Sequence, residues 1–506
     1  PPFSAVAWGN FSDSTEHPSG FGQLFITTNS AFEDSVQSKA AGFLEGYLTA
    51  DRIVDHNHNM QACGFPGATT LPAVYTNWLS AQDKYLRDNI ASNASSPWWS
   101  HMGLVLDQLD GLTEGFAASP NNTTISAMDL GILNAIGDFL DLLSALSPSQ
   151  APDFFKASPA EIMRYARTHS HCSALVKVTG NYSDLFFGHS SWFTYSSMLR
   201  IQKSYKFEFK NAATKGHTLS FSSYPGMLSS LDDFYMSDSG LAMVQTTNGI
   251  YDKDLYKLVT SSSALAWHRV RIAFYVATTG KEWAAAIAYQ NSGTYNNQAR
   301  AHMCGYDVIQ MPLFQPGKEL VEGTLTIVEQ IPGLVANVDA TGQLERGYFP
   351  SYNVPFIPEI YERSGYPALL AYHTKNGTLP LGDLAGLSYQ LAPRAKLFRR
   401  DQGTVVDMDT FKAIMRSNKF KTDPYAQDDP WSAICSRGDL ASQPSAGGCY
   451  DTKVSSSAWF PTMRAAVING PTTAGNTLPP FKWTPAFDGD AHMGQPTEYD
   501  FSFEEV

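Results

Sequence analysis

Hydrophobic positions along the chain separate it into two segments of different texture. In residues 1–171 the apolar side chains recur mostly at helical spacing, most clearly over 33–55 and 125–147, which predicts amphipathic helices. Ser158 and Glu161 frame a sequence with a Ser cap, a Pro and an acidic residue in the order that favours a helix start. The first segment is therefore expected to be mostly helical.

The second segment, residues 172–506, mixes strand and helix patterns. Two short runs with high β propensity, 172–178 and 184–190, are separated by a turn sequence and predict a hairpin. Further strands are predicted at 217–223, 240–247, 323–331 and 453–469, and further helices at 193–204, 262–276, 281–290 and 408–417. Because a regular β-α-β alternation is missing, we expect an α+β fold of stacked sheets with helices outside rather than a parallel doubly wound sheet.

Composition places the chain among folded proteins and excludes some functions. It has 506 residues, of which 43% are hydrophobic and 13% aromatic, so a large packed core is expected. The net charge is −13 and Lys and Arg form no run of four, which argues against nucleic acid as a partner. The longest apolar stretches, 125–147 and 262–279, are interrupted by charged residues, so no transmembrane helix is predicted.

Two features indicate a secretory route. The chain opens at Pro1 rather than at an initiator Met, and we expect a preceding segment such as a signal peptide to have been removed. Six N-x-S/T sequons would let glycans attach to surface loops, although a chain rich in Asn, Ser and Thr also contains sequons by chance. The candidate glycosylation sites are Asn10, Asn93, Asn121, Asn122, Asn181 and Asn376.

The cysteines agree with an oxidising compartment if most of them pair. There are five, so an oxidised protein leaves one thiol unpaired. Cys435 and Cys449 frame a Gly/Ser/Pro-rich loop and are predicted to form a local disulfide, with Cys63 and Cys304 as the candidate long-range pair. This assignment leaves Cys172 free.

Common catalytic and metal-binding motifs are missing. The sequence contains no G-x-S-x-G elbow, no P-loop lysine motif, no H-E-x-x-H and no G-x-G-x-x-G. His56 and His58 are close in sequence, but residues two apart do not share a helix face and no third ligand at suitable spacing is evident. No metal site is therefore predicted.

One cluster carries candidate chemistry. Cys172 stands at the start of the first hairpin strand, and His189 and Trp192 belong to the second strand and its extension. An antiparallel hairpin brings such positions together, so the thiol and the imidazole can form a catalytic pair. A small buried Cys at a strand start is more often a core residue than a nucleophile, and spacing alone favours that alternative.

A series of sequence blocks runs in order along most of the second segment. The blocks are 172–177, 188–192, 221–226, 232–235, 239–241, 246–247, 398–402, 415–418, 436–440, 469–472 and 492–496. Residues 46–50 add weaker support in the first segment. Together these blocks resemble the phospholipase B-like family of lysosomal glycoproteins, and their number and order make the resemblance specific.

That resemblance implies an N-terminal-nucleophile hydrolase fold, an αββα sandwich of two stacked, mostly antiparallel sheets that is made as a precursor and cleaved ahead of the cysteine. Cleavage after His171 would make Cys172 a chain terminus. Its α-amine, with a reference pKa of about 7.7 to 8.0, could then take the proton of its own thiol. The fragments would be 1–171 and 172–506, parts of one fold, with a linker near 150–171 that some relatives also trim.

The resemblance also implies roles for further residues. His189 would orient or polarise the reacting groups, and Trp192 would help to shape the pocket. Thr247 corresponds to a pocket threonine, Asn418 to an amide donor for the oxyanion, and Arg437 to a cation that stabilises the site.

Plainer roles stay open for three of these positions. Thr246 matches the family threonine almost as well as its neighbour does. Arg437 could simply pair with Asp439 or Asp451, and Asn418 could cap the helix predicted to end near residue 417.

The implied reaction is acyl transfer to water through an acyl-thioester on Cys172. The family name implies phospholipids or other fatty-acylated lipids as substrates, and with them contact with a membrane surface. An amidase acting on N-acyl lipids or small N-acyl compounds and a non-catalytic lipid-binding lysosomal glycoprotein are the alternatives. No metal or organic cofactor is implied, and the implied location is the lysosome or the exterior of the cell.

Overall fold

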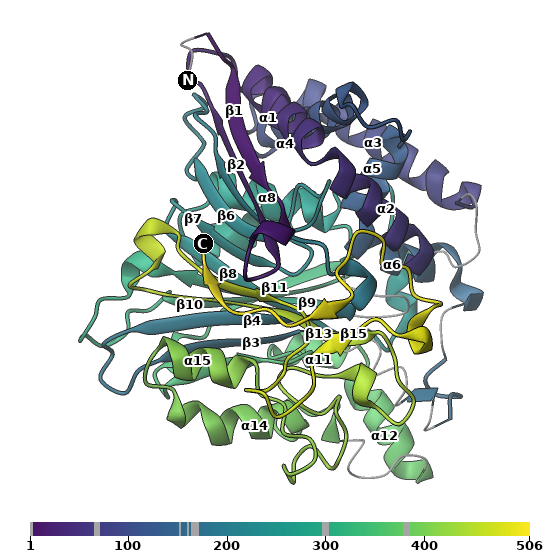
Figure 1. The fold of residues 1–506 in the computed structure, drawn as a ribbon, viewed down its shortest axis with the longest axis vertical. Coiled ribbons are helices and arrows are strands. Elements are labelled where there is room, and N and C mark those ends of the chain that lie inside the picture. Colours follow the sequence, from purple (N-terminus) through teal and green to yellow (C-terminus); the bar gives the residue numbers. More distant parts are fainter. Residues whose placement is uncertain are drawn as a thin grey trace.

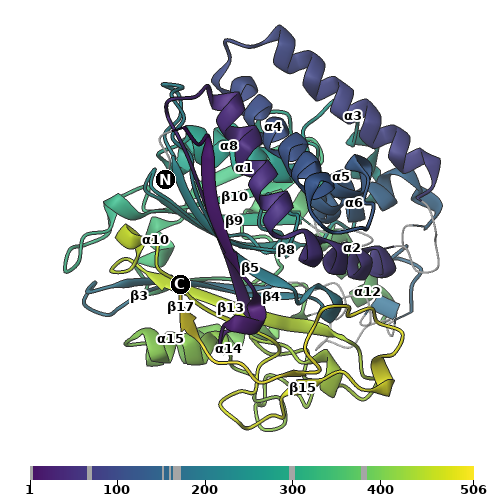
Figure 2. The ribbon, with the colours of Figure 1, turned by 45° about the horizontal axis from the view of Figure 1, so that its top comes forward.

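The computed structural model describes residues 4–64, 71–150, 153–158, 161–162, 172–295, 303–377 and 385–506. Within these ranges the protein is a mixed α+β structure in which two large, mostly antiparallel sheets are stacked and helices pack against their outer faces (Figure 1, Figure 2). The predicted α+β class with stacked sheets is confirmed.

The larger sheet has nine strands in the order β1-β2-β5-β6-β7-β8-β9-β10-β11. Its strands are β1 (Ala7–Ser12), β2 (Phe21–Thr28), β5 (Arg200–Lys206), β6 (Thr218–Ser223), β7 (Phe234–Ser237), β8 (Leu241–Asn248), β9 (Met303–Gln310), β10 (Leu325–Ile331) and β11 (Leu334–Asp339). Among the described strands of this sheet, β2 and β5 pair in parallel and the other neighbours pair antiparallel. Through the β2–β5 pair the first segment of the chain shares a sheet with the second.

The smaller sheet has six strands in the order β12-β3-β4-β13-β14-β17, all paired antiparallel. Its strands are β3 (Ser173–Val178), β4 (Leu185–Thr194), β12 (Tyr348–Ser351), β13 (Gly447–Ser456), β14 (Ala466–Asn469) and β17 (Glu504–Glu505). The predicted hairpin is β3 and β4, and it is confirmed. A separate pair, β15 (Phe481–Lys482) and β16 (Glu498–Tyr499), lies outside both large sheets.

Helices cover the outer face of each sheet (Figure 1). Those on the nine-stranded sheet are α1 (Asp34–Leu48), α2 (Ala50–Gly64), α3 (Ala73–Ser92), α4 (Pro97–Ala118), α5 (Ala127–Asn134), α6 (Ile136–Leu146), α8 (Ala266–Val276) and α9 (Gly280–Ala288). Those on the six-stranded sheet are α11 (Pro358–Arg363), α12 (Tyr366–Asn376), α14 (Pro393–Asp401) and α15 (Met408–Met415), and the short α10 (Thr341–Leu344) borders the space between the sheets. Separate apolar clusters fill the two helix–sheet layers and the layer between the sheets.

Most predicted elements are confirmed, but the helix predicted over 193–204 is wrong. This stretch holds the end of β4 and the start of β5. The strand predicted over 453–469 is instead the end of β13 and the whole of β14, with a short 3-10 helix at Phe460–Thr462 between them. The error over 193–204 has a physical cause, because β5 lies inside the nine-stranded sheet and two of its buried side chains, those of Arg200 and Lys203, are charged. Lys203, for example, forms an ion pair with Glu45 of α1 at 2.6 Å, and both side chains are fully buried. A strand whose buried positions carry charges does not show the apolar alternation by which strands are predicted.

Candidate active site

Cys172 directly precedes β3, next to the edge strand β12 of the six-stranded sheet. Its backbone φ is 71°, in the left-handed region that residues with a Cβ rarely adopt. The thiol is free, and only 4% of the residue is exposed. His171 lies outside the described residues, so the cleavage point stays a prediction.

Arg394 of α14 holds this backbone in place. Its guanidinium donates hydrogen bonds to the carbonyl oxygen of Cys172 at 2.5 Å and to Oδ1 of Asn353 at 2.6 Å, and lies 4.3 Å from the centre of the Trp192 ring. Burial lowers the pKa of Arg394 to about 9, so the cation persists at neutral pH. Neither Arg394 nor Asn353 was predicted, because no local motif links either residue to a cysteine some two hundred positions away.

The Cys172 thiol is protonated in the uncut chain. Burial raises its pKa to about 12, although the backbone N–H of Trp192 and the charge of Lys453 act in the opposite direction. Asp232 and Asp451 raise the pKa further. Since the thiolate is the nucleophile, this sulfur needs a proton acceptor before it can react.

His189 lies on the neighbouring strand β4, in register with Ala174 of β3 and with Lys453 of β13. Burial and then the charge of Lys453 hold its pKa well below the ordinary value, so the imidazole is neutral. Nδ1 lies 3.2 Å from the Lys453 ammonium and 3.2 Å from Oγ of Ser191. An ammonium can only donate, so Nδ1 accepts and the imidazole proton sits on Nε2.

A buried charge cluster surrounds this imidazole between the two sheets. Lys453 contacts Asp232 at 2.5 Å and Asp451 at 2.7 Å, and Arg200 of β5 contacts the same two carboxylates at 2.5 and 2.8 Å. Burial alone would raise the pKa of Asp232, but Arg200 and Lys453 outweigh it and hold that pKa below its ordinary value. The cluster is electrically balanced, with two cations for two carboxylates, as buried charges require.

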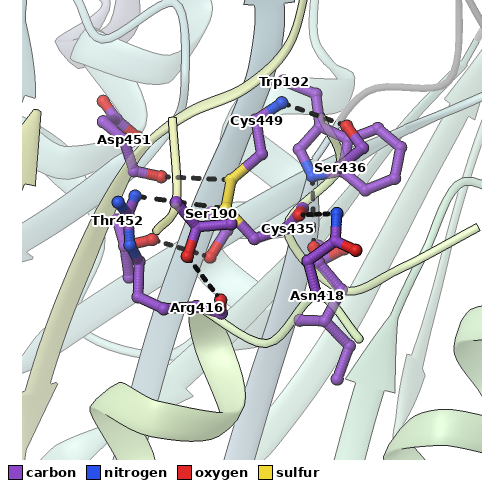
Figure 3. The surroundings of a disulfide bond; sticks show 12 residues. Ser190, Trp192, Arg416, Asn418, Cys435, Ser436, Cys449, Asp451 and Thr452 are labelled. Atoms are coloured by element: carbon purple, nitrogen blue, oxygen red, sulfur yellow. Dashed lines mark hydrogen bonds between the residues drawn. A yellow bond between two sulfur atoms is a disulfide. The ribbon is translucent and has the colours of Figure 1, made fainter. Parts of the chain in front are cut away.

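Trp192 lies on the opposite side of β4 from this cluster and packs against a disulfide (Figure 3). Its indole N–H donates to the carbonyl oxygen of Ile434 at 3.2 Å. The disulfide joins Cys435 and Cys449, as predicted, with the two sulfur atoms 2.01 Å apart. The bridge thus supports the wall against which the tryptophan ring rests.

Asn418 lies beside the same disulfide (Figure 3). Its amide nitrogen donates to the carbonyl oxygens of Pro430 at 3.1 Å and Cys435 at 2.9 Å, and its Oδ1 accepts from the backbone of Phe420 at 3.2 Å. Both amide protons are therefore used within the loop after α15. Asn418 therefore does not cap the helix, because α15 ends at Met415 and the bonds of Asn418 lie in the loop that follows.

Arg437 and the two threonines are placed less directly. Arg437 forms a bidentate ion pair with Asp439, at 2.6 and 2.8 Å, which is one of the two pairings left open above. The Thr246 hydroxyl contacts the Ser351 hydroxyl of β12 and so bridges the two sheets. Thr247 reaches the site through its backbone, since its carbonyl oxygen accepts from the Asn353 amide.

The structure places the Cys172 thiol beside the backbone N–H of Trp192 and near Lys453, Asp232 and Asp451, the charges that also surround His189. The thiol–imidazole pair itself stays a prediction, and the structure adds Arg394 and Asn353 to the group. Asn418 borders this group through the disulfide, and Arg437 is occupied by its own ion pair. The side chains of Cys63 and Cys304 lie outside the described residues, so their pairing stays a prediction.

The sequons differ in exposure. Asn10, Asn122, Asn181 and Asn376 are exposed. Asn93 and Asn121 are half-buried, and their side-chain amides donate to Asn89 and Asp51. The four exposed asparagines are therefore the more accessible glycosylation candidates.

The described ranges contain neither a candidate membrane-spanning helix nor a candidate metal site. No helix there has both the length and the apolar character needed to cross a membrane. No group of three or more His, Cys, Asp or Glu side chains in those ranges could hold a metal ion.

The fold and site define an α+β protein with two stacked sheets and a free, buried thiol at the start of a strand. The sequence profile of the family described as Phospholipase B matches residues 7–506, and the chain belongs to that family. It is 42% identical to Phospholipase B-like 1 of Rattus norvegicus, covering 98% of this chain and 86% of that protein. Phospholipase B-like 1 of Bos taurus is 43% identical, and Phospholipase B of Crotalus adamanteus is 41% identical, each over 98% of this chain and 87% of the relative.

Proposed function

We propose that this protein is a phospholipase B-like hydrolase that deacylates phospholipids or other fatty-acylated lipids through an acyl-thioester on Cys172. The observation that carries the proposal is the free, buried Cys172 at the head of β3, in a chain of the Phospholipase B family. The order of layers, helices outside two stacked sheets, supports an N-terminal-nucleophile hydrolase fold. The names of the relatives support phospholipid as the substrate class.

Maturation would begin with the same sulfur. The Cys172 thiol adds to the carbonyl carbon of His171, the peptide C–N bond breaks, and the nitrogen leaves as the α-amine of Cys172. Water then hydrolyses the thioester, which gives a carboxylate on His171 and frees the thiol. The products are the fragments 1–171 and 172–506, with any linker trimmed afterwards.

The new α-amine would be the proton acceptor that the thiol requires. With a reference pKa of about 7.7 to 8.0 it takes the thiol proton, and the sulfur attacks the acyl carbonyl of the substrate. The alcohol leaves with that proton, and water releases the fatty acid from the thioester. The neutral His189 holds its proton on Nε2 and would polarise a reacting oxygen.

The remaining residues would position the reaction. Trp192 would form part of the pocket wall, and Thr247 would fix the backbone of the pocket. Arg437 would stabilise the loop after α15. Asn418 would stabilise the oxyanion by exchanging one of its two backbone acceptors, Pro430 or Cys435, for the developing charge. An amide donor at an oxyanion is worth at most about 3 to 4 kcal/mol, and breaking the existing bond reduces that gain, so an Asn418→Ala variant should lose turnover more than binding but by less than this limit.

N-terminal sequencing of the fragments after acid incubation tests the proposal most directly. A new terminus at Cys172, absent in Cys172→Ala, supports self-cleavage by this sulfur. The same two fragments from Cys172→Ala would refute it. His189→Ala should remain folded but cleave and turn over more slowly, and unchanged kinetics would remove His189 from the mechanism.

The alternatives differ in what the cleaved protein does. Matched ester and amide substrates, with identical acyl chains, separate a lipid esterase from an amidase acting on N-acyl lipids or small N-acyl compounds. If cleaved protein with an accessible Cys172 binds lipid but turns over neither substrate, and Cys172→Ser binds equally well, the non-catalytic glycoprotein is the correct assignment.

We also propose the lysosome or the exterior of the cell as the location. The Cys435–Cys449 disulfide supports an oxidising compartment during folding, and the exposed sequons Asn10, Asn122, Asn181 and Asn376 support passage through the secretory pathway. Digestion with an N-glycan-specific endoglycosidase should lower the apparent mass of protein from its native source. An unchanged mass would contradict this route.

A further inference from the structure

A cleft of about 790 Å³ opens beside the edge of the six-stranded sheet. Its walls come from β12, from α11 and from α14, the helix that carries Arg394. Aromatic and proline side chains form most of its lining, chiefly Tyr348, Pro350, Tyr352, Phe356, Tyr361 and Tyr389. The volume is in the range of clefts that hold a small organic ligand.

Most of the tyrosine hydroxyls of this cleft donate hydrogen bonds to backbone carbonyl oxygens. Tyr352 donates to the carbonyl oxygen of Tyr389, Tyr389 donates to that of Pro350 at 3.3 Å, and Tyr361 donates to that of Leu387 at 3.1 Å. The rings are therefore fixed, and what they offer to a ligand is mainly their apolar faces. Such a surface suits acyl chains and a glycerol backbone rather than a strongly hydrated sugar.

Two exposed guanidiniums, those of Arg346 and Arg399, also line the cleft, against one carboxylate, Glu362. Neither arginine forms an ion pair with a carboxylate in the part of the chain that the structure describes. Arg399 is steadied by Gln390, to whose side-chain and backbone oxygens it donates at 3.2 and 3.3 Å. In a chain of net charge −13, this concentration of uncompensated positive charge matches an anionic group on the ligand.

One wall of the cleft borders the candidate active site. Tyr352 and Ala395 line the cleft, and their immediate chain neighbours are Asn353 and Arg394. Those neighbours bond to each other, and Arg394 also bonds to the carbonyl oxygen of Cys172. Through Asn353 and Arg394 the cleft therefore adjoins the residue that would carry the acyl group.

We propose that this cleft binds the phosphate-bearing part of a phospholipid, with the headgroup phosphate on Arg346 and Arg399 and the glycerol and first acyl carbons against the tyrosine rings. The inference rests on the proposed function for its substrate class and deepens it, because it assigns the choice of phosphorylated over neutral acyl lipids to two named side chains. Planar guanidiniums bind phosphate with paired hydrogen bonds, which a neutral headgroup cannot replace.

Binding of a non-hydrolysable ligand tests the cleft separately from the chemistry. The probe is a short-chain, ether-linked phosphatidylcholine kept below its micelle concentration, compared with the ether-linked diglyceride of the same chain length and with inorganic phosphate. The purified full chain is titrated as wild type, as Arg346→Gln/Arg399→Gln, and as the control Lys84→Gln/Lys206→Gln. The control removes the same charge from exposed positions in α3 and β5.

We expect the wild type to bind the phospholipid at least about tenfold more tightly than the diglyceride, and the Arg346→Gln/Arg399→Gln variant to lose that preference while the control keeps it. Unchanged phospholipid binding in the arginine variant, or equal wild-type affinity for phospholipid and diglyceride, would overturn the proposal. Inorganic phosphate binding as tightly as the phospholipid would overturn the role of the rings. If the protein shows the expected binding preference but hydrolyses no ester, the assignment of the cleft stands and the proposed function is refuted.

Discussion

The guanidinium of Arg394 donates a hydrogen bond to the backbone carbonyl oxygen of Cys172 across two elements, α14 and the start of β3. The same group lies on the face of the Trp192 ring and is also bonded to Asn353. One cation therefore fixes the left-handed backbone of the cysteine, the ring beside it and the turn after β12. This makes Arg394 a positioning residue whose effect on chemistry acts through Cys172.

Replacing Arg394 by Met should lower both stability and the rate of precursor cleavage. The carbonyl oxygen of Cys172 and Oδ1 of Asn353 would each lose a buried donor, at a cost of about 1 to 3 kcal/mol per acceptor. Urea unfolding measures the first effect, and the rate at which folded precursor gives two fragments measures the second. Arg394→Lys keeps the charge without the planar fork, so it should recover stability in part while cleavage stays slow. Full recovery of cleavage in Arg394→Lys would contradict the positioning role.

Removing one charged residue from the cluster around His189 should lower the free energy of unfolding. Lys453→Met leaves Asp232 and Asp451 with a single cation, Arg200, in a fully buried site. An uncompensated buried charge costs about 3 to 5 kcal/mol, and the free energy of unfolding should fall by that amount. Adding Asp451→Asn removes the surplus charge and should restore part of the loss. A double variant as unstable as the sum of the two single variants would show that the charges are not coupled.

The Cys435–Cys449 disulfide should stabilise the fold and the wall beside Trp192. The two cysteines are separated by 14 positions, and closing a loop of that size is worth about 3 kcal/mol in the chain-entropy model. A Cys435→Ala/Cys449→Ala variant should therefore unfold at lower urea concentration. Turnover should fall as well, because Trp192 and Asn418 both bond to the backbone that this bridge anchors. Loss of stability with unchanged turnover would separate the disulfide from the site.

The sequence predicted those parts of the structure that depend on neighbouring residues. The β3–β4 hairpin follows from two β-prone runs around a turn, and the Cys435–Cys449 bridge from a short loop between two cysteines. His189 could be placed beside the cysteine strand for the same reason, because a hairpin fixes its own register.

Contacts between distant buried charges left no such signal. Arg394 and Cys172 are 222 positions apart, and Lys453 and Asp232 are 221 apart. Predictions from side-chain periodicity assign each of these charged residues to the surface, because the neighbouring sequence does not show that an oppositely charged partner is buried with it. The helix wrongly predicted over 193–204 has the same origin. The aromatic cleft beside β12 was not predicted because its lining residues come from segments that are apart in the sequence.

Glu329 gives a prediction about pH. This residue of β10 is 2% exposed, and burial raises its pKa to about 7, although it accepts from the backbone N–H groups of Phe356 and Ile357 and from the Asn248 amide. The folded state therefore keeps the proton over a range in which the unfolded chain has lost it. Its contribution to stability is fully present at low pH and is lost as the pH rises from about 4.5 through 7.

The size of this effect follows from the two pKa values. A difference of about 2.5 units corresponds to about 3 kcal/mol, so the wild type should lose up to that amount from this residue between pH 5 and pH 8. Glu329→Gln cannot ionise and keeps one acceptor oxygen, which serves one of the two N–H groups that bond to different oxygens of the carboxyl. The difference in unfolding free energy between variant and wild type, measured by urea at pH 5, 6, 7 and 8, should shift in favour of the variant as the pH rises. The exposed Glu359→Gln variant serves as the control, and its difference from wild type should stay flat. A flat difference for Glu329→Gln as well would show that this buried carboxyl does not hold its proton at neutral pH.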